Sequence, residues 1–188
     1  MKKIEELLLF LTLLFLPTQL GRHFWPEFSF IYSLPIDYLS PTIYFWDLLV
    51  ICLMLVFLFR QKKVNEHSSS TNKTALNIFL LFILSQIISL IPYQSPGLNL
   101  GAGLVRAEQY LIAGLFGVYI ASKNVREIKG IFIWGLGLAI LGESVLAILQ
   151  FFKGGTIGLW VLGERSFSLS TPAIAKFDFH GVEFLRPY

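Results

Sequence analysis

Three long apolar runs, separated by short charged breaks, restrict this chain to very few kinds of fold. Residues 42–59 read TIYFWDLLVICLMLVFLF with one charge, at Asp47, and residues 75–92 read ALNIFLLFILSQIISLIP with none. Residues 130–152 read GIFIWGLGLAILGESVLAILQFF, again with one charge, at Glu143. About 20 helical residues cross the hydrocarbon layer of a bilayer. Because a chain this short has no core large enough to cover several such runs, the sequence predicts an integral membrane protein.

The composition agrees with a membrane protein. Only 14% of the 188 residues are charged, whereas soluble domains have about 25%. The net charge of +3 is small, and the basic residues gather in particular loops. We therefore interpret them as determinants of membrane topology rather than as a nucleic-acid surface. The single cysteine, Cys52, lies inside an apolar run, and the sequence has no cysteine or histidine cluster with metal spacing. We expect no metal and no cofactor.

The pattern predicts an all-α protein with about five transmembrane helices, at 4–20, 42–59, 75–92, 103–122 and 130–152. The first helix has a signal peptide as its alternative, but no small-residue cleavage site follows it. Residues 21–41 contain three prolines and many aromatic residues. Such a stretch is typical of a loop or re-entrant hairpin at the membrane–water boundary.

Basic residues follow the second and fourth predicted helices, and the positive-inside rule assigns both connections to the cytoplasm. The N-terminus is then cytoplasmic, and residues 21–41, 93–102 and 153–188 lie outside. We divide the chain into a transmembrane bundle, 1–152, and the start of an outer-face loop, 153–188. The last residues contain no closing helix, so we expect the N-terminal part of a larger polytopic bundle.

Ionisable groups at membrane depth are costly and are functional candidates for that reason. Asp47, Arg106, Glu108 and Glu143 all fall in the outer half of the membrane under this topology, where they would converge on an outward-facing cavity. Structural roles are the alternative. Arg106 would then reach the outer headgroups, Asp47 would form a bridge with it, and Glu143 would bond to a neighbouring helix.

Stripes of small residues mark two helices as closely packed. Ala113, Gly117 and Ala121 form one stripe, and Gly135 and Ala139 form another. Small residues at this spacing let helix backbones approach each other, so both stripes predict helix–helix contacts rather than chemistry.

The tail carries four basic side chains beside the proposed cavity: Arg165, Lys176, His180 and Arg186. Arginine forms strong charge-assisted bonds to a pyrophosphate, and a histidine is able to act as general base toward a hydroxyl. An ordinary solvated loop is the alternative reading, above all for Lys176 and His180.

Three segments resemble a known family. Residues 16–26, LPTQLGRHFWP, and 37–47, DYLSPTIYFWD, resemble the opening of bacterial O-antigen ligase/polymerase family membrane proteins, and residues 163–188, GERSFSLSTPAIAKFDFHGVEFLRPY, resemble their outer loop. The resemblance implies a multi-helix glycosyltransferase in the bacterial cytoplasmic membrane. Its substrate would be a glycan linked to undecaprenyl pyrophosphate, transferred to an acceptor on the outer face during assembly of cell-envelope polysaccharide.

In that family, outer-face arginines hold the pyrophosphate of the carrier. Arg186 matches the arginine of the family's L-R-P-Y motif, and Arg106 matches an arginine at the outer end of a helix. In the transferase hypothesis, Arg186 and Arg106 hold the pyrophosphate with Arg165 as a helper. The acids Asp47, Glu108 and Glu143 orient these arginines. The family's catalytic loop has no counterpart here, so no catalytic residue is assigned and this segment alone is expected to be inactive.

Two other functions fit the same pattern. A transporter or flippase for a lipid-linked sugar would also have buried charges in a cavity, although no internal repeat is visible. A non-catalytic membrane scaffold would need neither Arg106 nor Glu143. The expected partners are the lipid bilayer, the carrier-linked glycan and its acceptor, with no nucleic acid.

Overall fold

The structure is a computed structural model, and it describes residues 2–18, 20–36, 39–63, 70–90, 100–159, 176–179 and 182–185. The described part contains the helices α1 (Lys2–Leu14), α2 (Phe45–Lys63), α3 (Ser70–Ser89), α4 (Leu100–Ala121) and α5 (Val125–Lys153). Between α1 and α2 lie the strands β1 (Gly21–His23), β2 (Phe30–Ile31), β3 (Leu34–Pro35) and β4 (Thr42–Tyr44), with the 3-10 turn η1 (Glu27–Ser29). The strands β5 (Lys176–Phe179) and β6 (Val182–Leu185) follow α5.

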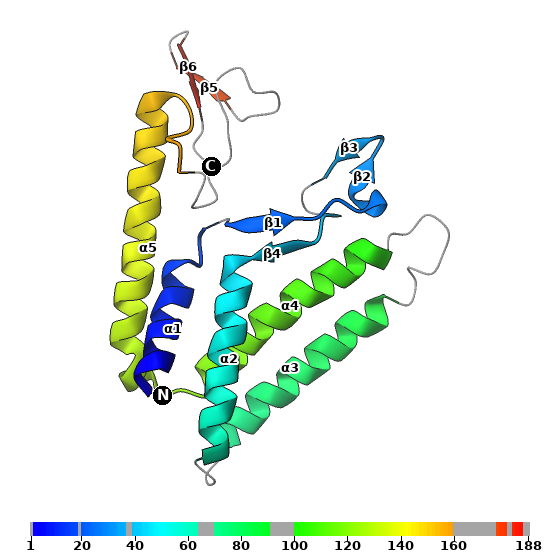
Figure 1. The fold of residues 1–188 in the computed structure, drawn as a ribbon, viewed down its shortest axis with the longest axis vertical. Coiled ribbons are helices and arrows are strands. Elements are labelled where there is room, and N and C mark those ends of the chain that lie inside the picture. The colour runs from blue at the N-terminus through cyan, green and yellow to red at the C-terminus, as the bar shows by residue number, and fades with distance from the viewer. Residues whose placement is uncertain are drawn as a thin grey trace.

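The helices alternate in direction along the long axis of the molecule. In Figure 1, α1, α3 and α5 run one way, and α2 and α4 run the other. Helix α1 packs between α5 and α2, α4 packs on α2, and α3 packs on α4. The result is one continuous row of helices, α5–α1–α2–α4–α3, in which sequence neighbours are not always neighbours in space.

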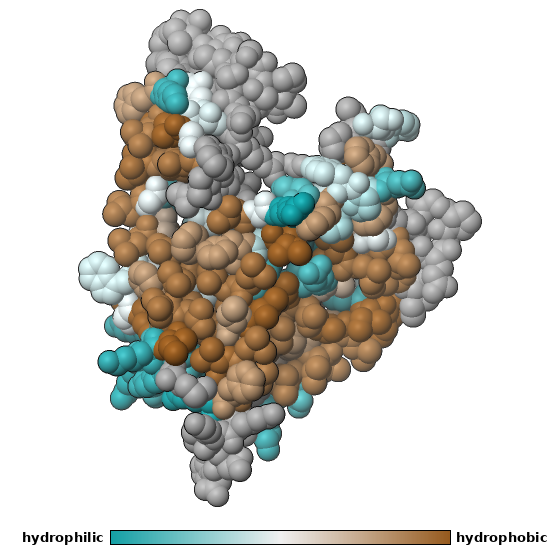
Figure 2. All heavy atoms as spheres, viewed as in Figure 1, coloured by the Kyte–Doolittle hydropathy of each residue, from teal (hydrophilic) through white to brown (hydrophobic). Residues whose placement is uncertain are grey.

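This alternation brings the basic segments of the chain to one end. We call it the basic end; it comprises residues 2–6, 60–63, 70–73 and 121–129, and teal side chains gather there in Figure 2. The paired strands all lie toward the opposite end, which we call the hairpin end (Figure 1). The two basic connections therefore share one end of the bundle, as the topology requires. Which compartment each end faces remains a prediction.

The first helix is shorter than expected. We predicted 4–20, whereas α1 ends at Leu14 and its 13 residues span about 20 Å, less than the roughly 30 Å of a hydrocarbon core. Tighter turns follow, with the Leu16 and Thr18 amides donating to carbonyls three residues earlier. Pro17 has no amide hydrogen to extend the α-helical ladder. The apolar run was correctly identified as helical, but its length is wrong.

Residues 21–41 form paired strands where a loop or re-entrant hairpin was expected. Strand β1 pairs antiparallel with β4, with Arg22 opposite Ile43. Strands β2 and β3 form a small hairpin. Its two turn residues, Tyr32 and Ser33, have φ of 49° and 63°, the left-handed values that a two-residue type I′ turn requires. Because β4 uses residues 42–44, helix α2 begins at Phe45 rather than at residue 42.

Local signals set the two ends of α5. The side chain of Asn124 accepts a hydrogen bond from the Arg126 amide at 3.0 Å, which caps the first turn. At the other end Gly154 has φ of 65°, and its amide donates to the Gln150 carbonyl at 2.9 Å, the left-handed ending that glycine favours. The asparagine cap explains why α5 starts at Val125, earlier than the predicted residue 130.

Two helices, α4 and α5, are long and apolar enough to cross a membrane by length and composition, with 22 and 29 residues. Little of either is buried inside the protein. Large apolar side chains of α3 and α5 are exposed, and brown atoms cover much of the face in Figure 2. Exposed apolar surface on this scale is typical of contact with a membrane or a partner. The mostly helical fold is confirmed, whereas the five membrane spans remain predictions, which the length and composition of α4 and α5 support weakly.

The best-buried apolar cluster lies where α1, α2 and α4 meet. Its members are Leu9, Leu13, Leu53, Phe57 and Tyr119. The rings of Phe57 and Tyr119 meet edge to face with centroids 5.2 Å apart, a preferred geometry for an aromatic pair. This cluster holds the three helices together near the basic end.

Several glycines of α4 and α5 permit close contacts with neighbouring segments, and only one of them, Gly135, belongs to a predicted stripe. A Cβ atom added at Gly135 would lie 2.9 Å from Cβ of Leu13, so the stripe on α5 packs against α1 as expected. On α4 one such contact is made by Gly114, against the ring of Phe79. Gly117, in the predicted stripe, has open space around its Cβ position. The predicted stripe therefore lies on an exposed face of α4, and not on the face that packs against α3.

Candidate functional site

Asp47 stabilises the start of α2. Its Oδ2 accepts a hydrogen bond from the Tyr44 amide at 2.8 Å. Tyr44 precedes the first helical residue, and Asp47 is the third helical residue, so this contact is one half of a capping box. A carboxylate in the first turn also interacts favourably with the helix dipole. This hydrogen bond supports a structural role for Asp47, the alternative to a functional one.

Arg106 and Glu108 lie in the second and third turns of α4, toward the hairpin end, and both side chains are exposed. Neither has an ion pair or a side-chain hydrogen bond within the described residues. They are two positions apart, so they project to opposite sides of the helix. The predicted convergence of Arg106 with Asp47 is not present in the described part of the chain.

Glu143 lies on α5, which packs against α1. It is partly buried, and no hydrogen bond or ion pair joins it to Asp47, Arg106 or Glu108 in the described residues. These four predicted residues all lie nearer the hairpin end than the basic end, but the structure does not bring them together into one cavity.

Most of the predicted tail residues cannot be placed. Arg165, His180 and Arg186 lie outside the described residues. Lys176 is the first residue of β5 and pairs in register with Leu185 of β6. Residues 176–179 and 182–185 thus pair as antiparallel strands, and the second strand ends at Leu185, the first residue of the L-R-P-Y motif.

The most highly connected charged group is Glu5, which the sequence analysis did not single out. The residue is 2% exposed. Its Oε2 accepts from Nη1 of Arg60 at 2.6 Å, and its Oε1 accepts from the Tyr119 hydroxyl at 3.1 Å and from the Lys123 ammonium. One carboxylate therefore joins α1 to the C-terminal end of α2 and to the region that follows α4. We call these four residues the Glu5 cluster.

Aromatic rings complete the surroundings of Lys123. Its Nζ lies 4.6 Å from the ring centroid of Phe57 and 4.7 Å from that of Tyr119, within the range of cation–π attraction. Every ionised group of the cluster has an opposite partner, so its chemistry is that of a structural brace rather than of proton transfer. The sequence offered one signal for this cluster: Glu5 is an acid that lies at the same end of the apolar runs as the basic loops.

A second polar cluster lies at the hairpin end. Nδ1 of His23 is 2.8 Å from the Thr42 hydroxyl and 3.0 Å from the Ser40 hydroxyl. The His23 ring stacks on Trp25, with centroids 5.7 Å apart. A histidine beside two hydroxyl groups resembles a base beside nucleophiles, but Ser40 is only 1% exposed. The contacts join β1 to the segment that enters β4.

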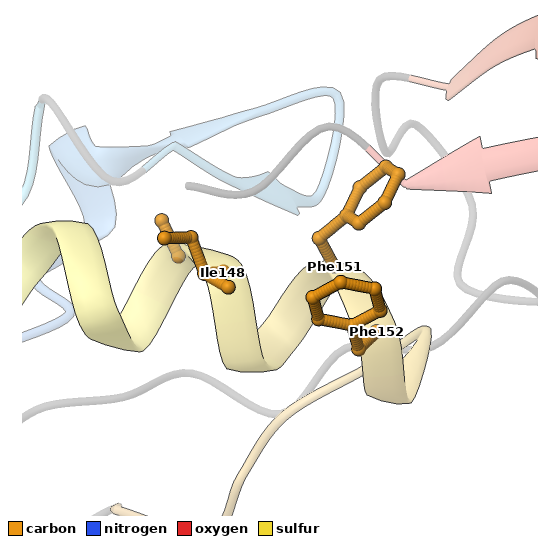
Figure 3. A pocket seen from close by; sticks show the side chains of 4 residues that line it. Ile148, Phe151 and Phe152 are labelled. Carbon is orange, nitrogen blue, oxygen red and sulfur yellow. The ribbon is translucent and has the colours of Figure 1, made fainter.

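An open apolar pocket of about 400 Å³ lies near the C-terminal end of α5 (Figure 3). Its lining is Ala147, Ile148, Phe151 and Phe152, and the two phenylalanine rings meet edge to face at 5.7 Å. Among the described residues no ionisable side chain lines it, so this lining offers contact to a hydrocarbon chain but no catalytic group.

Within the described residues, no three histidine, cysteine or acidic side chains lie close enough to hold a metal ion. No family, curated protein or solved structure matches the chain.

Proposed function

We propose that this chain takes part in transferring glycan from an undecaprenyl-pyrophosphate carrier to an acceptor on the outer face of a bacterial cytoplasmic membrane. The proposal follows the resemblance to O-antigen ligase/polymerase proteins. It is supported by one observation: segments that resemble the family, although far apart in sequence, lie at the same end of the bundle. Residues 16–26 contain β1, residues 37–47 contain β4, and these two strands pair. The hairpin β5–β6, from the third segment, lies toward the same end (Figure 1).

The basic end lies opposite the hairpin end, and this location supports the same proposed function. Under the positive-inside rule the basic end is cytoplasmic, and the hairpin end is then exposed to the compartment where the carrier is used. Arg106 lies toward this end, and its exposed guanidinium has no ion pair within the described residues, so it is available to a pyrophosphate. Arg186 and Arg165 are proposed as its partners, and Arg186 is the residue most specific to the family motif.

The proposal is tested by replacing Arg186 with alanine in the protein as its gene encodes it, in cells that lack the native copy. We expect loss of surface glycan transfer with normal amounts of protein in the membrane fraction. Lys153→Gln is a matched control, because it removes an exposed cation near the same end. Normal transfer by Arg186→Ala would overturn the assignment.

A non-catalytic membrane scaffold is the second candidate, favoured by the separation of Arg106 from Glu143. The two functions differ in one result. Arg106→Gln and Glu143→Gln should both leave a scaffold fully active, whereas Arg106→Gln should weaken a transferase. We retain the flippase alternative only as an outcome: carrier-linked glycan would then accumulate on the cytoplasmic face of the membrane in the Arg186→Ala strain.

A further inference from the structure

The basic end has cations that its acids do not neutralise. Lys3, Lys73, Arg126 and Lys129 are exposed there, and within the described residues none of their side chains has an ion pair or hydrogen bond. We call these four residues the basic rim. They come from the first two turns of α1, α3 and α5, so three helices contribute to one charged border.

Two acids of this end are engaged with cations outside the basic rim, and a third acid within the described residues, Glu127, is exposed between Arg126 and Lys129. Glu5 is bound to Arg60 and Lys123 inside the bundle. Glu6 lies 3.9 Å from Lys2 on the same helix. The four rim cations therefore outnumber Glu127, the one acid of this end that has no ion pair within the described residues.

The basic rim borders the exposed apolar surface of the helices. On α5, Lys129 is followed within a turn or so by Ile133 and Trp134, both of which are largely exposed. Arg126 and Lys129 are three residues apart and share a side of the helix. Cations directly beside lipid-exposed apolar residues lie at the level of phosphate headgroups. A nucleic acid would instead require a basic surface away from hydrocarbon, so a lipid surface fits this arrangement better.

We propose that the basic rim binds the phosphate groups of anionic phospholipids in the leaflet that surrounds the basic end. The inference depends on the membrane location proposed above, but not on glycan transfer. Each Lys or Arg near an anionic leaflet strengthens association by about fivefold at physiological salt. The four rim cations together select phosphatidylglycerol or cardiolipin over neutral lipid.

The test compares spin-labelled phosphatidylglycerol with spin-labelled phosphatidylcholine in vesicles of neutral lipid that contain the full chain. Electron paramagnetic resonance gives the association constant of each lipid with the protein, and the ratio of the two constants is the readout. We expect a ratio well above one for the wild type. The triple variant Lys3→Gln, Arg126→Gln, Lys129→Gln should lower it sharply, leaving only the contribution of Lys73 from the basic rim.

The control variant Arg22→Gln, Lys153→Gln removes exposed cations from the hairpin end and should leave most of the preference intact.

A salt titration of the wild type gives a second measurement that needs no variant. Raising ionic strength shortens the screening length from about 30 Å at 0.01 M to about 3 Å at 1 M, so the preference should fall steeply. Equal ratios in wild type and triple variant, or a preference unaffected by salt, would overturn the proposal. So would tighter binding of a short DNA duplex than of anionic lipid by the detergent-solubilised chain.

Discussion

Glu5 and Lys123, which are 118 positions apart in the chain, form an ion pair at the basic end of the bundle. The pair joins the first helix to the residues that connect α4 to α5, and Arg60 of α2 binds the second oxygen of the same carboxylate. A carboxylate that is almost fully enclosed is costly unless its partners are in place. Helix arrangements that separate Glu5 from these cations are therefore disfavoured, which gives the cluster a role in specifying which helices become neighbours.

Replacing Glu5 with glutamine should destabilise the bundle. The change leaves Arg60 and Lys123 without their anion while keeping the shape of the side chain. We expect a loss of about 3 kcal/mol, at the lower end of the range for breaking a buried pair, because the Arg60 side chain is 39% exposed. Unfolding by SDS in mixed micelles, followed by circular dichroism, gives the change in free energy.

Glu6→Gln is the matched control for this experiment. Glu6 is exposed and only 3.9 Å from Lys2 in an i,i+4 pair, and such surface pairs contribute about 0.5 kcal/mol or less. If Glu5→Gln and Glu6→Gln unfold at the same SDS fraction, the Glu5 cluster does not brace the fold.

Asp47 should behave as a helix-capping residue. Asp47→Ala removes the acceptor for the Tyr44 amide and should cost about 1 kcal/mol, the usual effect of losing a cap. Asp47→Asn keeps an oxygen acceptor and loses only the interaction of the charge with the helix dipole, about 0.5 kcal/mol. The same SDS titration ranks the two variants. An equal loss for Asn and Ala would show that the negative charge, rather than the hydrogen bond, is what matters at this position.

The helical elements were predictable because they depend on local pattern. The apolar runs identified the cores of α2, α3, α4 and α5, since residues that avoid water form helices whose backbone groups are satisfied within the segment. The ends were less predictable. The start of α5 depends on one asparagine side chain, and the start of α2 depends on pairing between strands that are 18 or more residues apart.

The candidate site was only partly predictable, for a different reason. Asp47, Arg106 and Glu143 were chosen by the depth in the membrane that their sequence positions predict. That depth does not determine which helices are adjacent. Because α5 packs on α1, Glu143 is not joined to Asp47 or Arg106. Glu5 was missed because a charge near the N-terminus normally remains in solvent, and only its long-range contacts with α2 and α4 reveal the burial.

Gly135 should be sensitive to substitution because of its contact with α1. Gly135→Leu places a side chain where a Cβ atom alone would lie 2.9 Å from Leu13, and overpacking of this kind costs about 1–3 kcal/mol. Gly137→Leu is the matched control, since its Cβ position has open space. The two variants should differ in SDS unfolding, and Leu13→Ala should restore part of the loss in Gly135→Leu. Equal stability of the two leucine variants would contradict the α1–α5 contact.

The two ends of the bundle should be accessible from opposite sides of the membrane. Glu27 lies in η1 at the hairpin end, Glu127 lies in the first turn of α5 at the basic end, and both are exposed. Each is replaced by cysteine in a Cys52→Ser background, which removes the native thiol. A membrane-impermeant maleimide should label Glu27→Cys in intact spheroplasts, because the hairpin end faces outward under the positive-inside rule.

Glu127→Cys should react with the same reagent only after the membrane is permeabilised, and denatured protein gives the total thiol for both variants. Labelling of Glu127→Cys alone in intact spheroplasts would reverse the orientation of the bundle. The paired strands β1 and β4 would then face the cytoplasm, and an outward-facing carrier site at the hairpin end would be impossible. Labelling of both positions from outside would show instead that the helices between them do not span the membrane.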